Sequence, residues 1–82
     1  MTNERPNGYN IGWEIVGDSY ISTAAVVTSS PYMGYYFIYE TIIWDWNGEI
    51  RGDIKQQITH KNKAKAMKVH GYIVNNMKMN EK

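Results

Sequence analysis

Hydrophobic and polar positions alternate with a period of two over residues 9–58, in runs interrupted by residues that favour turns. Successive side chains of a β-strand point to opposite faces of a sheet, so this period is typical of strands. The runs predict four strands, over residues 9–16, 19–29, 35–46 and 49–58. The third run is apolar at nearly every position, so one of its faces must build the core and the other must be covered or serve as a contact surface.

Two turn signals predict how these strands pair. Gly17-Asp18 suits a two-residue hairpin turn with glycine first, and Asn47-Gly48 is a strong hairpin signal because both residues tolerate positive φ. With two-residue loops, the numbers of facing residues sum to 35 in the first hairpin and to 95 in the second. The second register sets two attractive pairs opposite each other, Glu40 with Lys55 and Trp44 with Arg51.

These registers also predict which faces are buried. In the second hairpin the core face carries Phe37, Ile43, Ile54 and Ile58. In the first hairpin we assign the more apolar stripe to the core, which contains Ile11, Trp13, Ile15, Tyr20, Ser22, Ala24 and Val26. We expect the reverse face of that hairpin to be exposed, with Asn10, Gly12, Glu14, Ile21, Thr23 and Ala25.

From Asn62 to about Met79 the period changes to about 3.6, which indicates an amphipathic helix. Its apolar side carries Ala66, Val69, Ile73 and Met77, flanked by Met67, His70 and Val74. Asn62 is the expected N-cap, with Thr59 as the alternative if the helix begins earlier. Gly71 within this helix indicates either close packing or a weak point.

Together the elements predict an α+β fold of ββββα order, a four-stranded antiparallel sheet with one C-terminal amphipathic helix packed on one face. With 82 residues, the chain is long enough for one domain. We place this domain over residues 9–79, after a loose arm at residues 1–8 and before a frayed tail at residues 80–82.

Composition and charge narrow the class of protein. Cysteine is absent, which excludes disulfides and thiolate metal sites. The sequence shows no signal peptide and no apolar run near the ~20 residues of a membrane span, so a cytoplasmic protein is expected. Residues 1–50 hold one basic and six acidic side chains, whereas residues 51–82 hold eight basic and two acidic ones. The two halves either form separate charged surfaces or neutralise each other across the fold.

The face of residues 35–58 that points away from the predicted core is the best candidate site. Tryptophan, tyrosine and arginine commonly anchor protein interfaces. We therefore predict a protein-binding face made of Tyr36, Ile38, Ile42, Trp44, Trp46 and Arg51. The partner is a different protein or a second copy in a homodimer. Alternatively, the first hairpin or the helix covers this face within one chain.

A second hypothesis is nucleic-acid binding through the polar side of the helix. Lysines suit phosphate contacts and an aromatic ring can stack on a base. The candidate residues are Lys61, Lys65, Lys68 and Tyr72. The alternative is an ordinary solvated helix face, and the eight acidic residues of the chain argue against a dedicated duplex binder.

No catalytic constellation, metal site or cofactor motif is legible, so we expect a protein that is not an enzyme. His70 lies toward the apolar side of the helix and is expected to be a hydrogen-bonded structural residue, while His60 is expected to be exposed. Arg51-Gly52-Asp53 spells an integrin-binding tripeptide but is expected inside a strand, which favours coincidence.

The C-terminal half shows a family resemblance. It combines the strand from Tyr39 to Trp44 (YETIIW) with a helix that has Asn62, Ala66 and His70 at four-residue spacing. Over about 35 residues this resembles small uncharacterised phage and prophage proteins. Here asparagine replaces the hydroxyl cap of those proteins, and Lys63 and Lys65 stand where acids are common. The resemblance implies an α+β fold and an accessory role, such as inhibiting a bacterial host or defence protein in the host cytoplasm.

Overall fold

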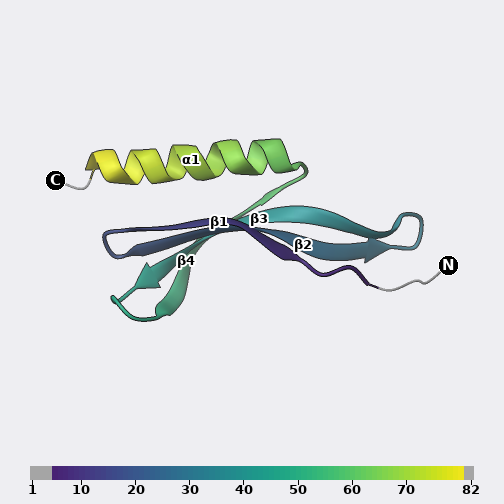
Figure 1. The fold of residues 1–82 in the computed structure, drawn as a ribbon, viewed down its shortest axis with the longest axis horizontal. Helices are drawn as coiled ribbons and strands as arrows, with labels where there is room; N and C mark the ends of the chain where they lie inside the picture. Colours follow the sequence, from purple (N-terminus) through teal and green to yellow (C-terminus); the bar gives the residue numbers. More distant parts are fainter. Residues whose placement is uncertain (1–4, 81–82) are drawn as a thin grey trace.

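Each strand pairs with the next along the chain, and the helix lies across one face of the resulting sheet (Figure 1). The computed structural model describes residues 5–80. The elements are β1 (Tyr9–Val16), β2 (Ser19–Ser30), β3 (Gly34–Trp46), β4 (Arg51–His60) and α1 (Lys63–Asn80). All three strand pairings are antiparallel. The predicted ββββα fold is confirmed.

The chain ends were predicted as an arm and a tail. Residues 1–4 of the arm lie outside the described residues, and Gly8 runs so close to β2 that a Cβ there would lie 2.6 Å from the Ala25 carbonyl oxygen. Of the tail, Asn80 is the last residue of α1, and residues 81–82 lie outside the described residues.

The first hairpin has the predicted register. Gly17 adopts a φ of 59°, which only glycine reaches without strain, and Val16 faces Ser19 across the two-residue turn. Facing numbers sum to 35 from there to Gly12, where a β-bulge shifts the pairing by one residue.

The predicted register of the second hairpin is wrong. Asn47 has no positive φ; instead its Oδ1 accepts hydrogen bonds from the backbone N–H groups of Glu49 (2.8 Å) and Ile50 (3.0 Å). This side chain closes a four-residue loop over residues 47–50, across which Trp46 faces Arg51. Two irregularities beside Trp44 shift the pairing further, so that Thr41 faces Ile58. Neither expected pair is directly opposite, because Glu40 faces Thr59 and Trp44 faces Ile54. The predicted contact of Arg51 with the Trp44 ring is nevertheless present.

Two irregularities on either side of Trp44 also change what β4 buries. Ile43 is buried and Ile58 half-buried on the helix side, as predicted. Ile54 instead stands opposite Trp44, is 49% exposed, and does not join the core. Phe37 packs edge-on against Tyr9, with ring centroids 5.6 Å apart.

The buried core lies between α1 and the sheet. It is built from Val16, Ile21, Ile43 and Val74, with Ile73 and Met77 packed against it. The predicted faces of the first hairpin are therefore reversed. Ile21 and Thr23 have no exposed surface, whereas Trp13 is 53% exposed. The physical reason is volume, since a helix approaches small side chains more closely than a row of aromatic rings.

The helix begins as predicted. Asn62 Oδ1 accepts a hydrogen bond from the Lys65 N–H at 2.7 Å, which makes Asn62 the N-cap. Gly71 is not a position of close packing, because a Cβ added there would meet no atom within 4 Å. Of the two alternatives, close packing is therefore excluded, and a weak point at Gly71 stays a prediction.

The molecule is elongated, with extents of 53 × 25 × 16 Å. The hairpin of β2 and β3 extends past the start of α1, and we name this two-stranded part the β2–β3 extension (Figure 1). Tyr32, at the tip of the β2–β3 extension, is 97% exposed.

Candidate protein-binding face

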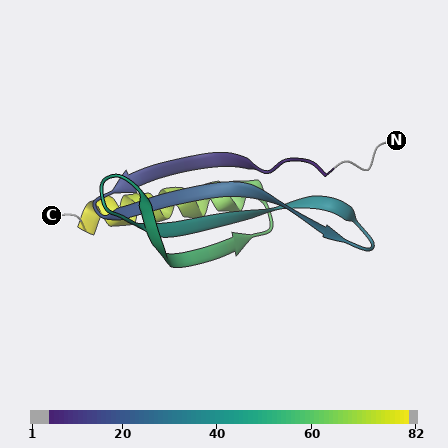
Figure 2. The same ribbon diagram turned by 90° about the horizontal axis from the view of Figure 1, so that it is seen from below.

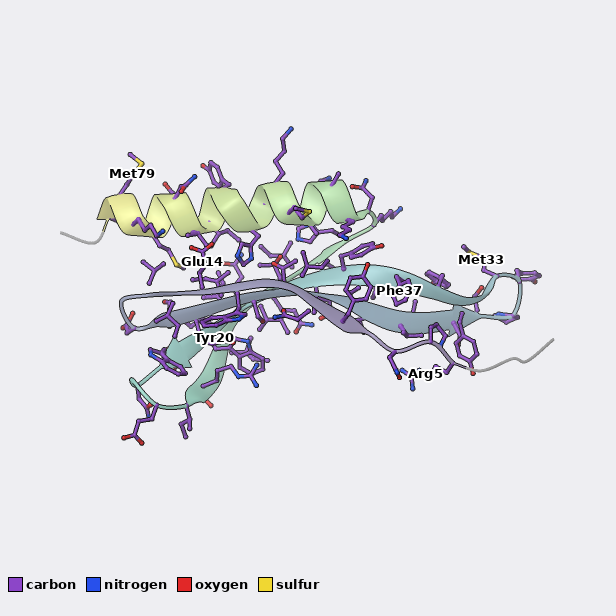
Figure 3. The ribbon with its side chains drawn as sticks, in the orientation of Figure 1. Arg5, Glu14, Tyr20, Met33, Phe37 and Met79 are labelled. Atoms are coloured by element: carbon purple, nitrogen blue, oxygen red, sulfur yellow. The ribbon has the colours of Figure 1, made fainter. Side chains whose placement is uncertain are left out.

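The face of the sheet opposite α1, hereafter the outer face, is the most unusual surface of the molecule. Within residues 5–80 all four strands belong to one sheet and the one helix lies on the other side, so neither the first hairpin nor α1 covers it (Figure 2). Figure 3 shows the contrast, with Tyr20 on the outer face and Glu14 between the sheet and the helix.

Four aromatic rings and one guanidinium gather near one end of this face; we name Trp13, Tyr20, Trp44, Trp46 and Arg51 the aromatic cluster. The rings of Trp13 and Tyr20 stack in parallel, with centroids 5.6 Å apart. The Tyr20 ring lies 5.5 Å from that of Trp46. The indole N–H of Trp44 donates to Ser22 Oγ at 3.3 Å, which orients that ring. Three strands thus contribute rings to one continuous surface.

Arg51 completes the cluster from β4. Its guanidinium carbon lies 5.3 Å from the centroid of the Tyr20 ring and 5.1 Å from that of Trp44, within the range of cation–π attraction. The irregular pairing beside Trp44 bends the end of the hairpin, so that the loop joining β3 to β4 crosses in front of β2 (Figure 2). The contact between Arg51 and Trp44 therefore exists although these residues do not face each other in the sheet.

The predicted partner-binding residues separate into two groups. Trp44, Trp46 and Arg51 belong to the aromatic cluster, and Ile42 is half-buried next to them. Tyr36 and Ile38 lie on the same face but farther along β3, toward the β2–β3 extension. There they face Thr28 and Val26 of β2. The eight residue steps from Tyr36 to Trp44 span about 27 Å of strand, so the predicted residues form one face but two separate contact regions.

Trp13 and Tyr20 are site residues that sequence reasoning missed, because it placed them in the core. Tyr20 faces Trp44 in the pairing of β2 with β3, and facing residues share a side of the sheet. The signal in the sequence that identifies Trp13 and Tyr20 is the pairing of β2 with β3 across the loop that joins these two strands.

A second cluster of functional groups lies between α1 and the sheet. Thr23 Oγ1 lies 2.7 Å from His70 Nδ1 and 2.8 Å from Thr41 Oγ1, and Thr41 Oγ1 lies 3.2 Å from His60 Nε2. Glu14 Oε1 is 3.6 Å from His70 Nε2. The order acid, histidine, hydroxyl is that of a catalytic triad, but both threonines are fully buried, so a substrate cannot reach these hydroxyls while α1 stays packed.

The histidines of this cluster have a structural role. His70 is hydrogen-bonded under the helix, as predicted. The expectation that His60 is exposed is wrong, since it is only 4% exposed. Burial, and secondarily the positive charge of Lys65, lower the pKa of His60 below its usual value, so that His60 is neutral at pH 7.

The basic residues lie mainly on the helix side. Lys61, Lys65, Lys68 and Tyr72, the candidates for nucleic-acid binding, are all exposed. Other lysines neutralise acids of the N-terminal half, with Lys78 lying 3.5 Å from Glu14 and Lys55 3.4 Å from Asp18 and 3.5 Å from Asp45. The charge asymmetry is thus partly neutralised and partly displayed as a basic helix surface.

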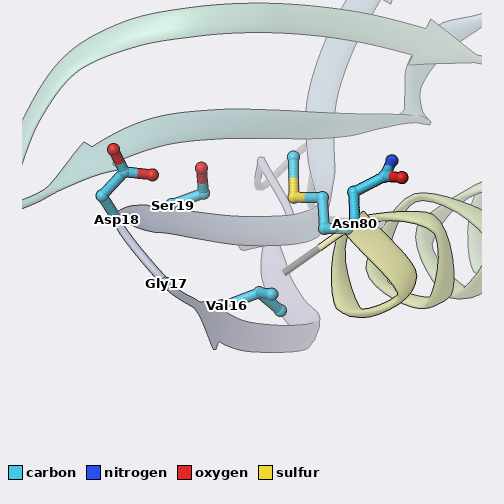
Figure 4. Close-up of a pocket in the computed structure, with 6 residues that line it drawn as sticks. Val16, Gly17, Asp18, Ser19 and Asn80 are labelled. Atoms are coloured by element: carbon cyan, nitrogen blue, oxygen red, sulfur yellow. The ribbon is translucent and has the colours of Figure 1, made fainter. Parts of the chain in front are cut away.

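One cavity opens where the turn between β1 and β2 meets the end of α1 (Figure 4). It has a volume of about 310 Å³ and is lined by Val16, Gly17, Asp18, Ser19, Met77 and Asn80. Two of its polar side chains are already engaged, because Lys55 Nζ donates to Ser19 Oγ at 2.9 Å and lies beside the Asp18 carboxylate. This cavity therefore offers little free chemistry.

Neither a metal site nor a membrane-spanning helix is found within residues 5–80. That part of the chain has no group of three or more histidine, aspartate or glutamate side chains arranged to hold a metal ion. Its helix is not apolar enough to cross a membrane. No family model, curated protein or solved structure matches the chain.

Proposed function

We propose that this protein is a non-enzymatic protein-binding module that uses the outer face of its sheet. The observation that carries the proposal is the aromatic cluster, in which an exposed Trp13 adjoins the half-buried Tyr20, Trp44 and Trp46 on the sheet face opposite α1. Rigid aromatic side chains bury a large area with little loss of conformational entropy, which makes them frequent anchors of protein interfaces.

The finer proposal concerns the biological setting. Its support is the resemblance of the strand Tyr39–Trp44 and of the helix positions Asn62, Ala66 and His70 to small phage and prophage proteins. A phage-encoded inhibitor of a bacterial host or defence protein, acting in the host cytoplasm, fits that resemblance. Such an inhibitor works by covering a surface of its target and needs no catalytic residue of its own.

The test is capture of partners from bacterial lysate by the immobilised protein. Trp44→Ala combined with Trp46→Ala removes two anchors of the cluster and is expected to abolish capture. Trp13→Ala is the milder variant, because this ring is already 53% exposed and its loss disturbs the fold least. Lys68→Ala with Tyr72→Ala on α1 is the matched control and is expected to capture partners normally.

Circular dichroism of each variant shows whether the fold persists. Undiminished capture by a folded double tryptophan variant contradicts the proposal. Loss of capture only in the α1 variant would assign binding to the helix instead.

A second copy of the chain is the other partner that fits an apolar sheet face. Sedimentation at two protein concentrations tests this version. A mass that rises with concentration in the wild type, but not in Trp13→Ala, indicates a homodimer through the outer face.

Nucleic-acid binding is the second candidate function. It is favoured by one observation, namely that residues 61–80 contain five lysines and no acidic residue. Tyr72, 70% exposed, stands on the same helix as a stacking platform. This function predicts binding to DNA or RNA that weakens steeply with salt and is lost in Lys65→Ala with Lys68→Ala. Absent or salt-insensitive binding contradicts it.

A further inference from the structure

We infer that the aromatic cluster receives an arginine side chain from a basic segment of the partner, an inference that rests on the proposed function and names the chemistry of its partner. The cluster already holds a guanidinium, since that of Arg51 lies over the rings of Tyr20 and Trp44. Arg51 is thus an internal stand-in for the incoming side chain.

A hollow beside Arg51 provides the space. It measures about 470 Å³ and is lined by Tyr20, Trp46, Glu49, Ile50 and Arg51. Aromatic rings attract a cation through their quadrupole, and a carboxylate adds a charge-assisted hydrogen bond. Arginine uses both interactions better than lysine, because its planar guanidinium stacks on a ring and offers several donors at once.

The charges of the outer face favour a basic occupant. Glu49 lines the hollow, and Glu40 is half-buried farther along the face, where the side-chain amide of Gln57 donates to it. Lys55, the nearest lysine in sequence, is directed toward Asp18 and Asp45 instead. Arg51 is therefore the cation that an incoming guanidinium must displace or stack beside.

Displacement of Arg51 is feasible because its contacts are weak and exposed. Arg51 is an exposed residue at the start of β4, directly after the four-residue loop. Surface cation–π contacts have free energies that correspond to about a two- to fivefold change in an equilibrium constant. The Arg51→Ala variant removes the competing cation and, with it, the repulsion between Arg51 and the incoming guanidinium. This variant should therefore bind the incoming arginine about two- to fivefold more tightly.

The experiment is an NMR titration of the labelled full chain with the peptide acetyl-Gly-Arg-Gly-Arg-Gly-amide. The indole N–H signals of the three tryptophans report directly on the cluster. We expect saturable shifts of Trp44 and Trp46, and none with the same peptide carrying citrulline, the uncharged isostere of arginine. Equal shifts with both peptides, or none with either, overturn the inference.

Three variants locate the interaction. Glu49→Gln should weaken binding of the arginine peptide by up to about fivefold, and Arg51→Ala should strengthen it. Asp53→Asn is the control, since it removes one negative charge from the same hairpin but does not line the hollow. Equal weakening by Glu49→Gln and Asp53→Asn, or weaker binding in Arg51→Ala, overturns the inference.

The outcome is separable from that of the lysate experiment. If the double tryptophan variant loses its partner but the arginine peptide causes no shift, the outer face binds a protein through other chemistry. In that case this inference fails and the proposed function stands. If the double tryptophan variant also retains its partner, the proposed function fails as well.

Discussion

Two isoleucines of the first hairpin provide a direct test of which sheet face is the core. Ile21 on β2 has no exposed surface and packs under α1, whereas Ile15 on β1 is 40% exposed on the outer face. Hydrophobicity along the hairpin alone favours the opposite assignment, with Ile15 inside. The same substitution at each position therefore separates the two arrangements.

The expected costs differ several-fold. Truncation of a buried isoleucine to alanine destabilises a protein by about 2–5 kcal/mol, and shortening it to valine by about 0.5–1.5 kcal/mol. Ile21→Ala should thus remove much of the net stability, which for a chain of this size is about 4–12 kcal/mol. Ile15→Ala should cost less than about 1 kcal/mol, because part of its side chain remains in water in the folded state.

Urea unfolding, followed by tryptophan fluorescence and by far-ultraviolet circular dichroism, measures these costs. Ile21→Val and Ile15→Val form the second pair, in case Ile21→Ala does not fold. For the valine pair, a difference of 1 kcal/mol shifts the urea midpoint by about 0.3–1 M. Agreement between the two signals supports a two-state transition, which the comparison requires.

Equal or reversed costs at Ile15 and Ile21 would refute the placement of the core between α1 and the sheet. Urea unfolding of the same variants at two protein concentrations adds a second result. A cost at Ile15 that grows with concentration shows that another copy covers the outer face, because association then contributes to the stability of the wild type.

Four further changes follow from local geometry. Gly71→Ala should raise the free energy of unfolding by about 0.5–1 kcal/mol, because alanine favours a helix and its Cβ meets open space; a loss in thermal melts contradicts this. Gly8→Ala should lower stability in the same assay, because its Cβ would lie 2.6 Å from a carbonyl oxygen. Asn62→Ala should cost about 1 kcal/mol through loss of the N-cap hydrogen bond, and an unchanged urea midpoint would exclude that cap. Because burial, the larger cause, and a neighbouring lysine lower the pKa of His60, its neutral form favours folding; stability should fall as the pH drops below about 6.5 toward the folded-state pKa, and His60→Asn should flatten that dependence in urea titrations.

Features set by short-range chemistry were predictable from sequence. Gly17 requires no partner to favour positive φ, and Asn62 caps the turn that it begins, so both predictions agree with the structure. Asn47-Gly48 shows where such reasoning stops. The asparagine side chain can also accept hydrogen bonds from the backbone two and three residues later, and this competing arrangement lengthens the loop by two residues.

The buried faces depend on pairings between hairpins, which no single turn reports. The predicted loop after the second strand already places Ser29 opposite Tyr35, and this pairing is observed. Extending it along both strands sets Tyr20 opposite Trp44, and the register of the first hairpin then places Trp13 on the same side. Together, these pairings place the apolar stripe of the first hairpin and the tryptophans of β3 on one face of the sheet. The single helix therefore covers either both groups or neither of them.

One helix covers only one face of a sheet, and the shapes of the side chains decide which. On the helix side, Gly12, Thr23 and Ala25 leave a shallow surface, and a Cβ at Gly12 would lie 3.9 Å from His70 Nε2. The helix matches it with Ala66, which is fully buried, and with the hydrogen bond between His70 and Thr23. Aromatic rings would hold a helix farther away, and on that face His70 would lose the hydroxyl partner that Thr23 provides. The tryptophans are therefore left out of the core because of their volume, and they form the apolar surface that the proposed function assigns to a partner.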